Sequence, residues 1–167
     1  MSQRLLAFPP VARPDARVLI LGSMPSAASL RQGFYYVHPR NAFWRIVADV
    51  FGAPVPATVD EKVMLLTDHR IALWDALTAC EREGSLDSAI RSPELNDFST
   101  LFESCPDIRT VLFNGGTARR LFMKGGAGYL EGRVWRALPS TSPAYTLSYE
   151  KKLALWRQAL EATDESV

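Results

Sequence analysis

Four short apolar runs, each followed by small or polar residues, most constrain what this chain can fold into. The runs are rich in β-branched and aliphatic residues, and they alternate with longer stretches whose apolar residues recur at helical spacing. Such an alternation predicts an α/β fold, in which helices cover both faces of a mainly parallel sheet of buried strands. The four predicted strands span residues 18–21, 71–74, 110–113 and 134–138.

The segments between these strands carry helix signals. Residues 41–51 place large apolar side chains on one face, and Thr58 with Glu61 forms a capping box before a helix that should end near Arg70. Ser148 is a suitable N-cap for a last helix. Shorter helices are expected over 87–91 and 97–105 and, after the third strand, through Phe122, with a loose turn at 125–128.

Composition is that of an ordinary globular protein. The 167 residues suit one domain spanning 1–167, with 47% hydrophobic and 22% charged residues. No apolar stretch is long enough to cross a bilayer, and proline and charge interrupt residues 1–17 too often for a secretory signal, so the cytoplasm is the expected location. Cys80 and Cys105 are expected to be reduced core thiols.

Charge alone does not indicate a polyanionic partner, because the formal net charge is only +1. Among the 19 basic residues, however, only four are lysine. Arginine suits phosphate through its bidentate fork, although an ordinary solvated surface explains the same residues equally well.

Small and polar residues follow each predicted strand. They are Gly22-Ser23-Met24, Trp74-Asp75, Asn114-Gly115 and Leu138-Pro139-Ser140. If the strands are parallel, all four segments meet at one rim of the sheet, which is where ligands bind in open α/β folds.

The chain resembles the uracil-DNA glycosylase superfamily, in particular its mismatch-specific uracil and hypoxanthine (deoxyinosine) DNA glycosylase branches. The resemblance rests on GSMPS after the first strand, on GFYYVHPRNAFW, and on LPSTSP late in the chain. It implies a three-layer α/β/α sandwich with a central four-stranded parallel sheet. It also implies hydrolysis of the N-glycosidic bond of a damaged base that has been flipped out of DNA.

The sequence departs from this superfamily at three positions. Met24 stands where many members carry a water-activating Asp or Asn, and the resemblance to the hypoxanthine branch implicates Asn41 instead. Leu138 replaces a His or Asn before Pro-Ser, and Tyr145 replaces an Asn later in that loop. These departures bear on substrate preference more than on reaction type.

Three residues are candidates for the chemistry. The Asn41 amide carries a donor and an acceptor and could hold a water against the sugar carbon, although asparagine at this position also suits a helix N-cap. Backbone N–H groups of Ser23 and Met24 could stabilise negative charge on the departing base. His38 could act as an acid near neutral pH or could be structural.

The base-binding candidates lie at the strand ends and in the paired tyrosines. Tyr36, with Tyr35 second, could stack on the base, although both could equally be core aromatics. Asp75 could accept from the base N–H or serve as a cap or ion-pair partner. The other candidates are Gly22, Met24 and Asn114, the last of which also suits a turn.

DNA contacts are expected from residues 140–145, here called the late loop, and from the loop that follows the first strand. Ser140 could contact a phosphate, and Tyr145 could wedge into the vacated base stack, unless 140–145 is a plain connection to the last helix. Thr141, Ser142, Pro25, Ser26 and Arg40 are the remaining candidates.

The resemblance and these candidate residues predict a DNA repair glycosylase. We expect it to be monofunctional, that is, to leave the DNA strand uncut, because no lysine lies in any of the motifs to form a Schiff base. We expect no metal and no organic cofactor. The expected partner is DNA containing hypoxanthine or uracil, bound by a monomer away from membranes. Two alternatives stay open: a hydrolase of free nucleosides or nucleotides, and a DNA- or nucleotide-binding domain that has kept the fold and lost the chemistry.

Overall fold

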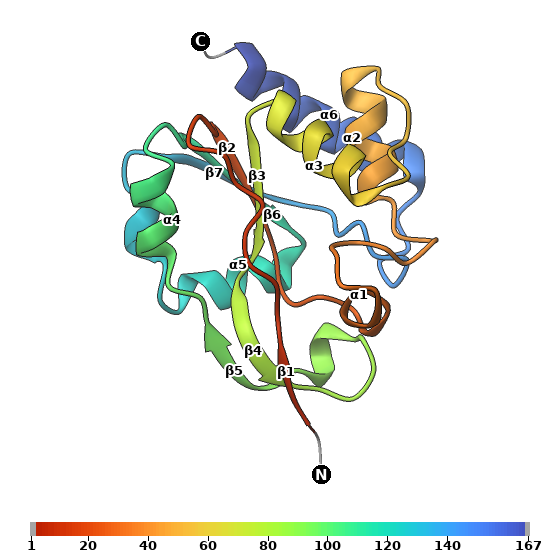
Figure 1. Ribbon diagram of the computed structural model, residues 1–167, viewed down its shortest axis with the longest axis vertical. Helices are drawn as coiled ribbons and strands as arrows, with labels where there is room; N and C mark the ends of the chain where they lie inside the picture. The colour runs from red at the N-terminus through yellow and green to blue at the C-terminus, as the bar shows by residue number, and fades with distance from the viewer. Residues whose placement is uncertain (1–2, 166–167) are drawn as a thin grey trace.

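A computed structural model describes residues 3–165, and its centre is a four-stranded parallel sheet (Figure 1). The sheet order is β3-β2-β6-β7, and the prediction of parallel strands is confirmed. The strands are β2 (Val18–Gly22), β3 (Ile71–Asp75), β6 (Thr110–Asn114) and β7 (Val134–Leu138). β2 pairs with β3 so that Gly22 lies beside Asp75, and β6 pairs with β7 so that Asn114 lies beside Leu138.

Helices cover both faces of this sheet, which confirms the three-layer arrangement (Figure 1). One face packs against α2 (Phe43–Phe51), α3 (Val59–Asp68) and α6 (Tyr149–Glu165). The opposite face packs against α4 (Phe98–Ser104) and α5 (Gly116–Met123). Side chains alternate along each strand, so Leu19 and Leu21 belong to one core while Val18 and Ile20 belong to the other.

Local signals set the bounds of several helices. The Thr58 hydroxyl accepts from Glu61 N at 3.1 Å, and the Glu61 carboxylate accepts from Ala57 N at 3.0 Å, which is the predicted capping box with the return bond shifted by one residue. Asp97 caps α4 by accepting from Ser99 N at 3.0 Å. Capping therefore fixes where the chain turns from loop to helix.

Several elements differ from the sequence-based expectation. A small antiparallel sheet of order β1-β4-β5 and the short helix α1 (Ala27–Gln32) were not expected, because their segments are short and lack clear periodicity. β7 was expected to be buried, but its residues 134–137 are exposed, whereas β3, the other edge strand of this sheet, is buried throughout. The new strands are β1 (Arg4–Leu6), β4 (Leu77–Glu81) and β5 (Arg91–Leu95), and the 3-10 turns are η1 (Asp87–Ala89) and η2 (Ala127–Leu130).

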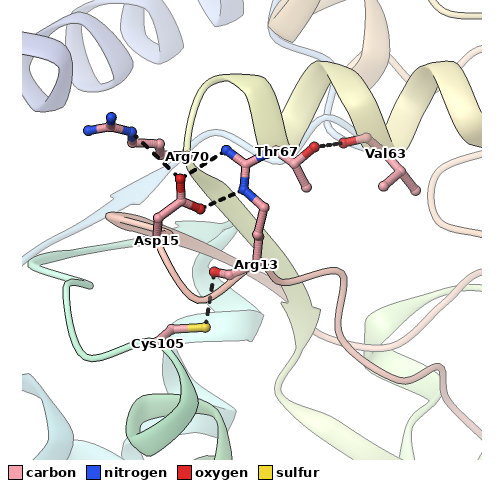
Figure 2. Close-up of polar contacts among 6 residues, drawn as sticks. All are labelled: Arg13, Asp15, Val63, Thr67, Arg70 and Cys105. Carbon is pink, nitrogen blue, oxygen red and sulfur yellow. Dashed lines mark hydrogen bonds and ion pairs between the residues drawn. The ribbon is translucent and has the colours of Figure 1, made fainter.

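The amino ends of the strands are held by polar contacts that lie away from the strand carboxyl ends. Figure 2 shows Asp15 between Arg13 and Arg70, with an Arg13 Nε–Asp15 Oδ1 distance of 2.7 Å. The Cys105 thiol donates to the Arg13 carbonyl oxygen at 3.4 Å. Cys105 and Cys80 are both buried free thiols, as predicted. Among the described residues, no helix has the length and apolar character needed to cross a membrane.

Trp156 offers a direct test of the core on the α6 side. Its side chain is fully buried, and its indole N–H donates to the Pro139 carbonyl oxygen at 2.9 Å. We expect Trp156→Ala to lower the free energy of unfolding by about 3–5 kcal/mol, because it leaves a large cavity and an unpaired carbonyl.

Urea denaturation measures this change, and the neighbouring Leu155, which is 45% exposed, supplies a matched control on the same helix. Leu155→Ala should cost less than about 1 kcal/mol. Equal losses for the two variants would contradict the packing described here.

Candidate active site

A cavity of about 920 Å³ opens at the carboxyl end of the parallel sheet. Its wall combines the ends of all four strands with three loops that are distant in sequence. These loops contribute residues from 35–41, 85–88 and 139–147. The parallel register thus gathers segments from across the chain at one rim, as the sequence predicted.

Most of the residues singled out in the sequence line this cavity. They are Gly22, Ser23, Pro25, Ser26, Tyr35, Tyr36, His38, Asn41, Asp75, Asn114, Ser140, Thr141, Ser142 and Tyr145. Two candidates do not lie on its wall. Met24 follows the end of β2, and its apolar side chain is buried in the core on the α4–α5 side. Arg40 is exposed and lines an adjacent hollow instead.

One part of the cavity wall is formed by Gly22, Asp75 and Tyr36. A Cβ atom on Gly22 would lie 2.5 Å from Asp75 Oδ1 and 2.6 Å from the Tyr36 hydroxyl. Only glycine therefore leaves room for these two polar groups at the end of β2. Both Asp75 Oδ2 and the Tyr36 hydroxyl are buried without a well-formed hydrogen bond. Buried polar atoms of this kind call for a functional explanation.

Burial changes the protonation of this wall. It raises the pKa of Asp75 to about 7, with a further rise from the nearby Asp87 carboxylate and an opposing effect of Arg82. Burial, and next the Asp75 carboxylate, also raises the pKa of the Tyr36 phenol, and the Asn114 side chain offsets part of that rise. The tyrosine is therefore neutral across the physiological range, while Asp75 changes its charge within it.

The two tyrosines have different environments. Tyr35 is 2% exposed, donates to the Pro9 carbonyl oxygen at 2.7 Å, and packs edge-on against Phe8. Tyr36 adopts a left-handed backbone conformation with φ of 53° and packs against Phe43 with ring centroids 4.4 Å apart. A non-glycine residue in this conformation is strained and is often found at functional sites. Tyr36 is thus the better placed of the two to meet a ligand.

Asn41 combines a structural contact with a position on the cavity wall. Its Oδ1 accepts from Phe43 N at 3.0 Å in the turn before α2, whose N-cap residue is Ala42 and which begins two residues later than predicted. Within residues 3–165, its Nδ2 makes no hydrogen bond. The nearby His38 Nδ1 accepts from Arg40 N at 3.1 Å. A structural hydrogen bond and a place on the cavity wall therefore coexist in Asn41.

Asp87 is a cavity residue that the sequence analysis missed as a site candidate. The Ser23 hydroxyl donates to Asp87 Oδ1 at 2.7 Å, which joins the end of β2 to η1. The buried Arg82 donates to the carbonyl oxygens of Pro25 and Gly84 and so holds the same two loops together. Nothing in the sequence indicated these contacts, because β4 and β5, which bring the 84–89 segment to the cavity, were not predicted.

The late loop is held by hydrogen bonds from two elements. Asn114 Nδ2 donates to Thr141 Oγ1 at 3.0 Å, and Thr141 N donates to Asn114 Oδ1 at 2.9 Å. The Thr141 carbonyl oxygen accepts from Ala42 N at 3.0 Å. From α6, Lys152 Nζ donates to the Ser142 carbonyl oxygen at 3.0 Å. The Asn114 amide is thus engaged with Thr141, which is itself buried.

A basic hollow adjoins the cavity and shares Tyr36, His38 and Asn41 with it. Its cations are Arg40, Arg45, Lys62 and Lys152, and no acidic side chain of the described residues lines it. Such a surface suits a phosphodiester backbone. Across residues 3–165, no group of three or more His, Cys, Asp or Glu side chains is arranged to hold a metal ion.

The buried Asp75 carboxyl predicts a specific dependence of stability on pH. Because its pKa is higher in the folded state than in the unfolded state, the native protein loses stability as pH rises from about 4 to about 7. Asp75→Asn removes the ionisation, so we expect it to stabilise the fold at about pH 8 by on the order of a few kcal/mol, and by much less at about pH 4.

Denaturant unfolding at the two pH values measures this difference. Asp97→Asn is the matched control, because the exposed Asp97 carboxylate has a lowered pKa and should give no gain as pH rises. A stability difference between wild type and Asp75→Asn that does not grow with pH would contradict the assignment.

Comparison with known proteins places this geometry in a family. The family model described as the uracil DNA glycosylase superfamily matches residues 9–163. A hypoxanthine DNA glycosylase from Methanosarcina acetivorans is 42% identical over 139 residues, covering 82% of this chain and 85% of that protein. A hypoxanthine DNA glycosylase from Methanosarcina barkeri is 39% identical over 109 residues, covering 65% of this chain and 69% of that protein.

A solved structure agrees with these relatives. The solution NMR structure of a Methanosarcina acetivorans protein, described provisionally as a uracil DNA glycosylase, matches with a TM-score of 0.84 at 35% identity. The match covers 98% of this chain and all of that one. With its three-layer fold and its cavity at the strand ends, the chain belongs to the uracil DNA glycosylase superfamily.

Proposed function

We propose that this protein is a monofunctional DNA repair glycosylase that releases hypoxanthine, and by the same chemistry uracil, from DNA. The observation that carries the proposal is the cavity at the strand ends, where Asp75 and Tyr36 present buried polar atoms without partners. The relatives named hypoxanthine DNA glycosylases support hypoxanthine as the first base to test.

The reaction would begin with extrusion of the damaged nucleotide from the duplex, which costs on the order of a few kcal/mol in lost stacking. Tyr36 would then stack on the base, and Asp75 would read its edge. When the glycosidic bond breaks, its electron pair leaves with the base nitrogen, and the oxygen of a water held by Asn41 adds to the sugar carbon. The water proton passes to solvent, the released base is protonated, and an abasic site remains in the strand.

The DNA backbone would lie along the basic hollow beside the cavity. Arg40 and Arg45 would neutralise phosphates there, and Tyr145 stands 49% exposed at the tip of the late loop. Its ring could fill the gap left by the extruded base. Because one chain supplies every wall of this site, we infer that the protein acts as a monomer. As a separate proposal, we assign it to the cytoplasm.

The two alternative functions make different predictions. A hydrolase of free nucleosides would not need the basic hollow or the exposed Tyr145, and the names of the relatives do not favour it. Labelled duplexes with one hypoxanthine, uracil, xanthine or mismatched thymine, treated with alkali after incubation, reveal abasic sites. Turnover of free deoxyinosine but not of duplex DNA would overturn the proposal, as would DNA binding with no abasic product.

Asn41→Ala tests the water-positioning role. We expect single-turnover excision of hypoxanthine to fall on the order of 100-fold, because the water loses its orienting group. The change also removes the acceptor for Phe43 N, so Asn41→Ser is the matched variant: a serine hydroxyl can accept from the N–H two residues on but reaches less far. Asn41→Ser should keep the thermal stability of the wild type and still lose most activity. Full activity in this variant would leave Asn41 only its structural hydrogen bond to Phe43 N.

Tyr145→Ala tests the wedge. If the ring fills the vacated stack, its removal should slow excision from duplex DNA about tenfold or more. Single-stranded DNA has no stack to fill, so excision from it should change much less. The ratio of the two rates is the readout, and an equal effect on both substrates would place Tyr145 outside the duplex contact.

A further inference from the structure

Asp75 is the one acidic side chain of the described residues that lies on the cavity wall and is almost completely buried. It is 2% exposed, and its Oδ1 faces Gly22 at the end of the neighbouring strand. Within residues 3–165, no hydrogen bond reaches either carboxyl oxygen, and Oδ2 is fully enclosed. An ionised carboxylate in such a place would be very unfavourable without a partner.

The groups that face Asp75 do not supply that partner. Asp87, from η1, adds a second negative charge at the cavity. Arg82, just after β4, is the nearby cation, but it donates to the carbonyl oxygens of Pro25 and Gly84 and forms no ion pair with Asp75.

The two tyrosines of the 33–42 segment complete the surroundings of Asp75. The pKa of each phenol is raised, mainly by burial and then by Asp75 itself, so both are neutral. The balance of charge around Asp75 therefore favours its protonated form, in keeping with a pKa of about 7.

The protonation state decides what Asp75 can do to a leaving base. Breaking the glycosidic bond sends an electron pair into the base, so negative charge grows on its ring nitrogens and carbonyl oxygen. A carboxylate beside that charge would oppose the reaction. A neutral carboxyl group instead offers an O–H donor to the base carbonyl oxygen and a C=O acceptor to the adjacent base N–H.

We propose that Asp75 works in its protonated form, as the hydrogen-bond donor that stabilises the carbonyl oxygen of the departing base. This inference rests on the proposed function and specifies its base-reading group. Asp87 acts as a positioning residue in this scheme: its negative charge adds to the effect of burial in keeping the proton on Asp75, and its bond to the Ser23 hydroxyl fixes the distance between the two loops.

The test is the pH dependence of single-turnover excision from a duplex with one deoxyinosine, measured between about pH 6 and pH 8.5. For wild type, the rate should fall with rising pH through about 7, approaching about tenfold per pH unit. Asp75→Asn keeps a neutral donor, so it should lose less than about tenfold at pH 6 and should show no such fall. Asp75→Ala should lose on the order of 100-fold or more at pH 6 and should also show no such fall.

Asp87→Asn provides an independent readout if Asp75→Asn fails to fold. Asparagine still accepts from the Ser23 hydroxyl but removes the negative charge, so the pKa of Asp75 should fall and the alkaline decline of the rate should begin at a lower pH. A merely structural role for Asp87 would lower the rate without moving this decline.

Three results would overturn the inference while leaving the proposed function intact. The alkaline decline could persist unchanged in Asp75→Asn, or Asp75→Asn could be as inactive as Asp75→Ala although folded and able to bind DNA. An unmoved decline in Asp87→Asn would count equally against it. Absence of abasic product from wild type at any pH would instead end the proposed function itself.

Discussion

The in-register parallel pairing of β2 with β3, and of β6 with β7, is the constraint on which the rest of the structure depends. It sets Gly22 beside Asp75 and Asn114 beside Leu138, so that four strand ends finish at one level. Each strand contributes backbone polar groups and one or two side chains to the rim. A slip of one residue would turn every side chain of a strand to the opposite face. The same hydrogen-bond ladder that stabilises the core therefore builds the site.

The site contains several features that are unfavourable for folding on their own. Because Gly22 has no side chain, Asp75 and Tyr36 can approach the end of β2. Asp75 is buried without a hydrogen bond to its carboxyl group, and Tyr36 sits in a left-handed conformation. Each feature lowers the stability of the fold on its own, and the surrounding core, with the late loop bonded to Asn114 and α6, maintains them together.

Much of this arrangement could be predicted from the sequence, for physical reasons. Buried parallel strands appear in the sequence as continuous apolar runs, and the polar residues after such strands meet at one rim of the sheet. The location of the cavity could therefore be predicted from the four strand segments, of which residues 18–21 are the first. The small sheet β1-β4-β5 could not be predicted, because its strands have no clean alternation. Asp87 was missed with it. For Met24, the motif gave the residue at that position but not the direction of its side chain, which is buried in the core on the α4–α5 side.

The most direct test of the central claim is a crystal structure with a duplex that carries a 2′-fluoro-substituted deoxyinosine, an analogue that resists cleavage. The account predicts that the hypoxanthine leaves the stack and lies in the cavity at the strand ends, stacked on Tyr36 with its carbonyl edge against Asp75, while the strand follows the basic hollow. A base that stays within the duplex, or DNA bound to another face with the cavity empty, would contradict it.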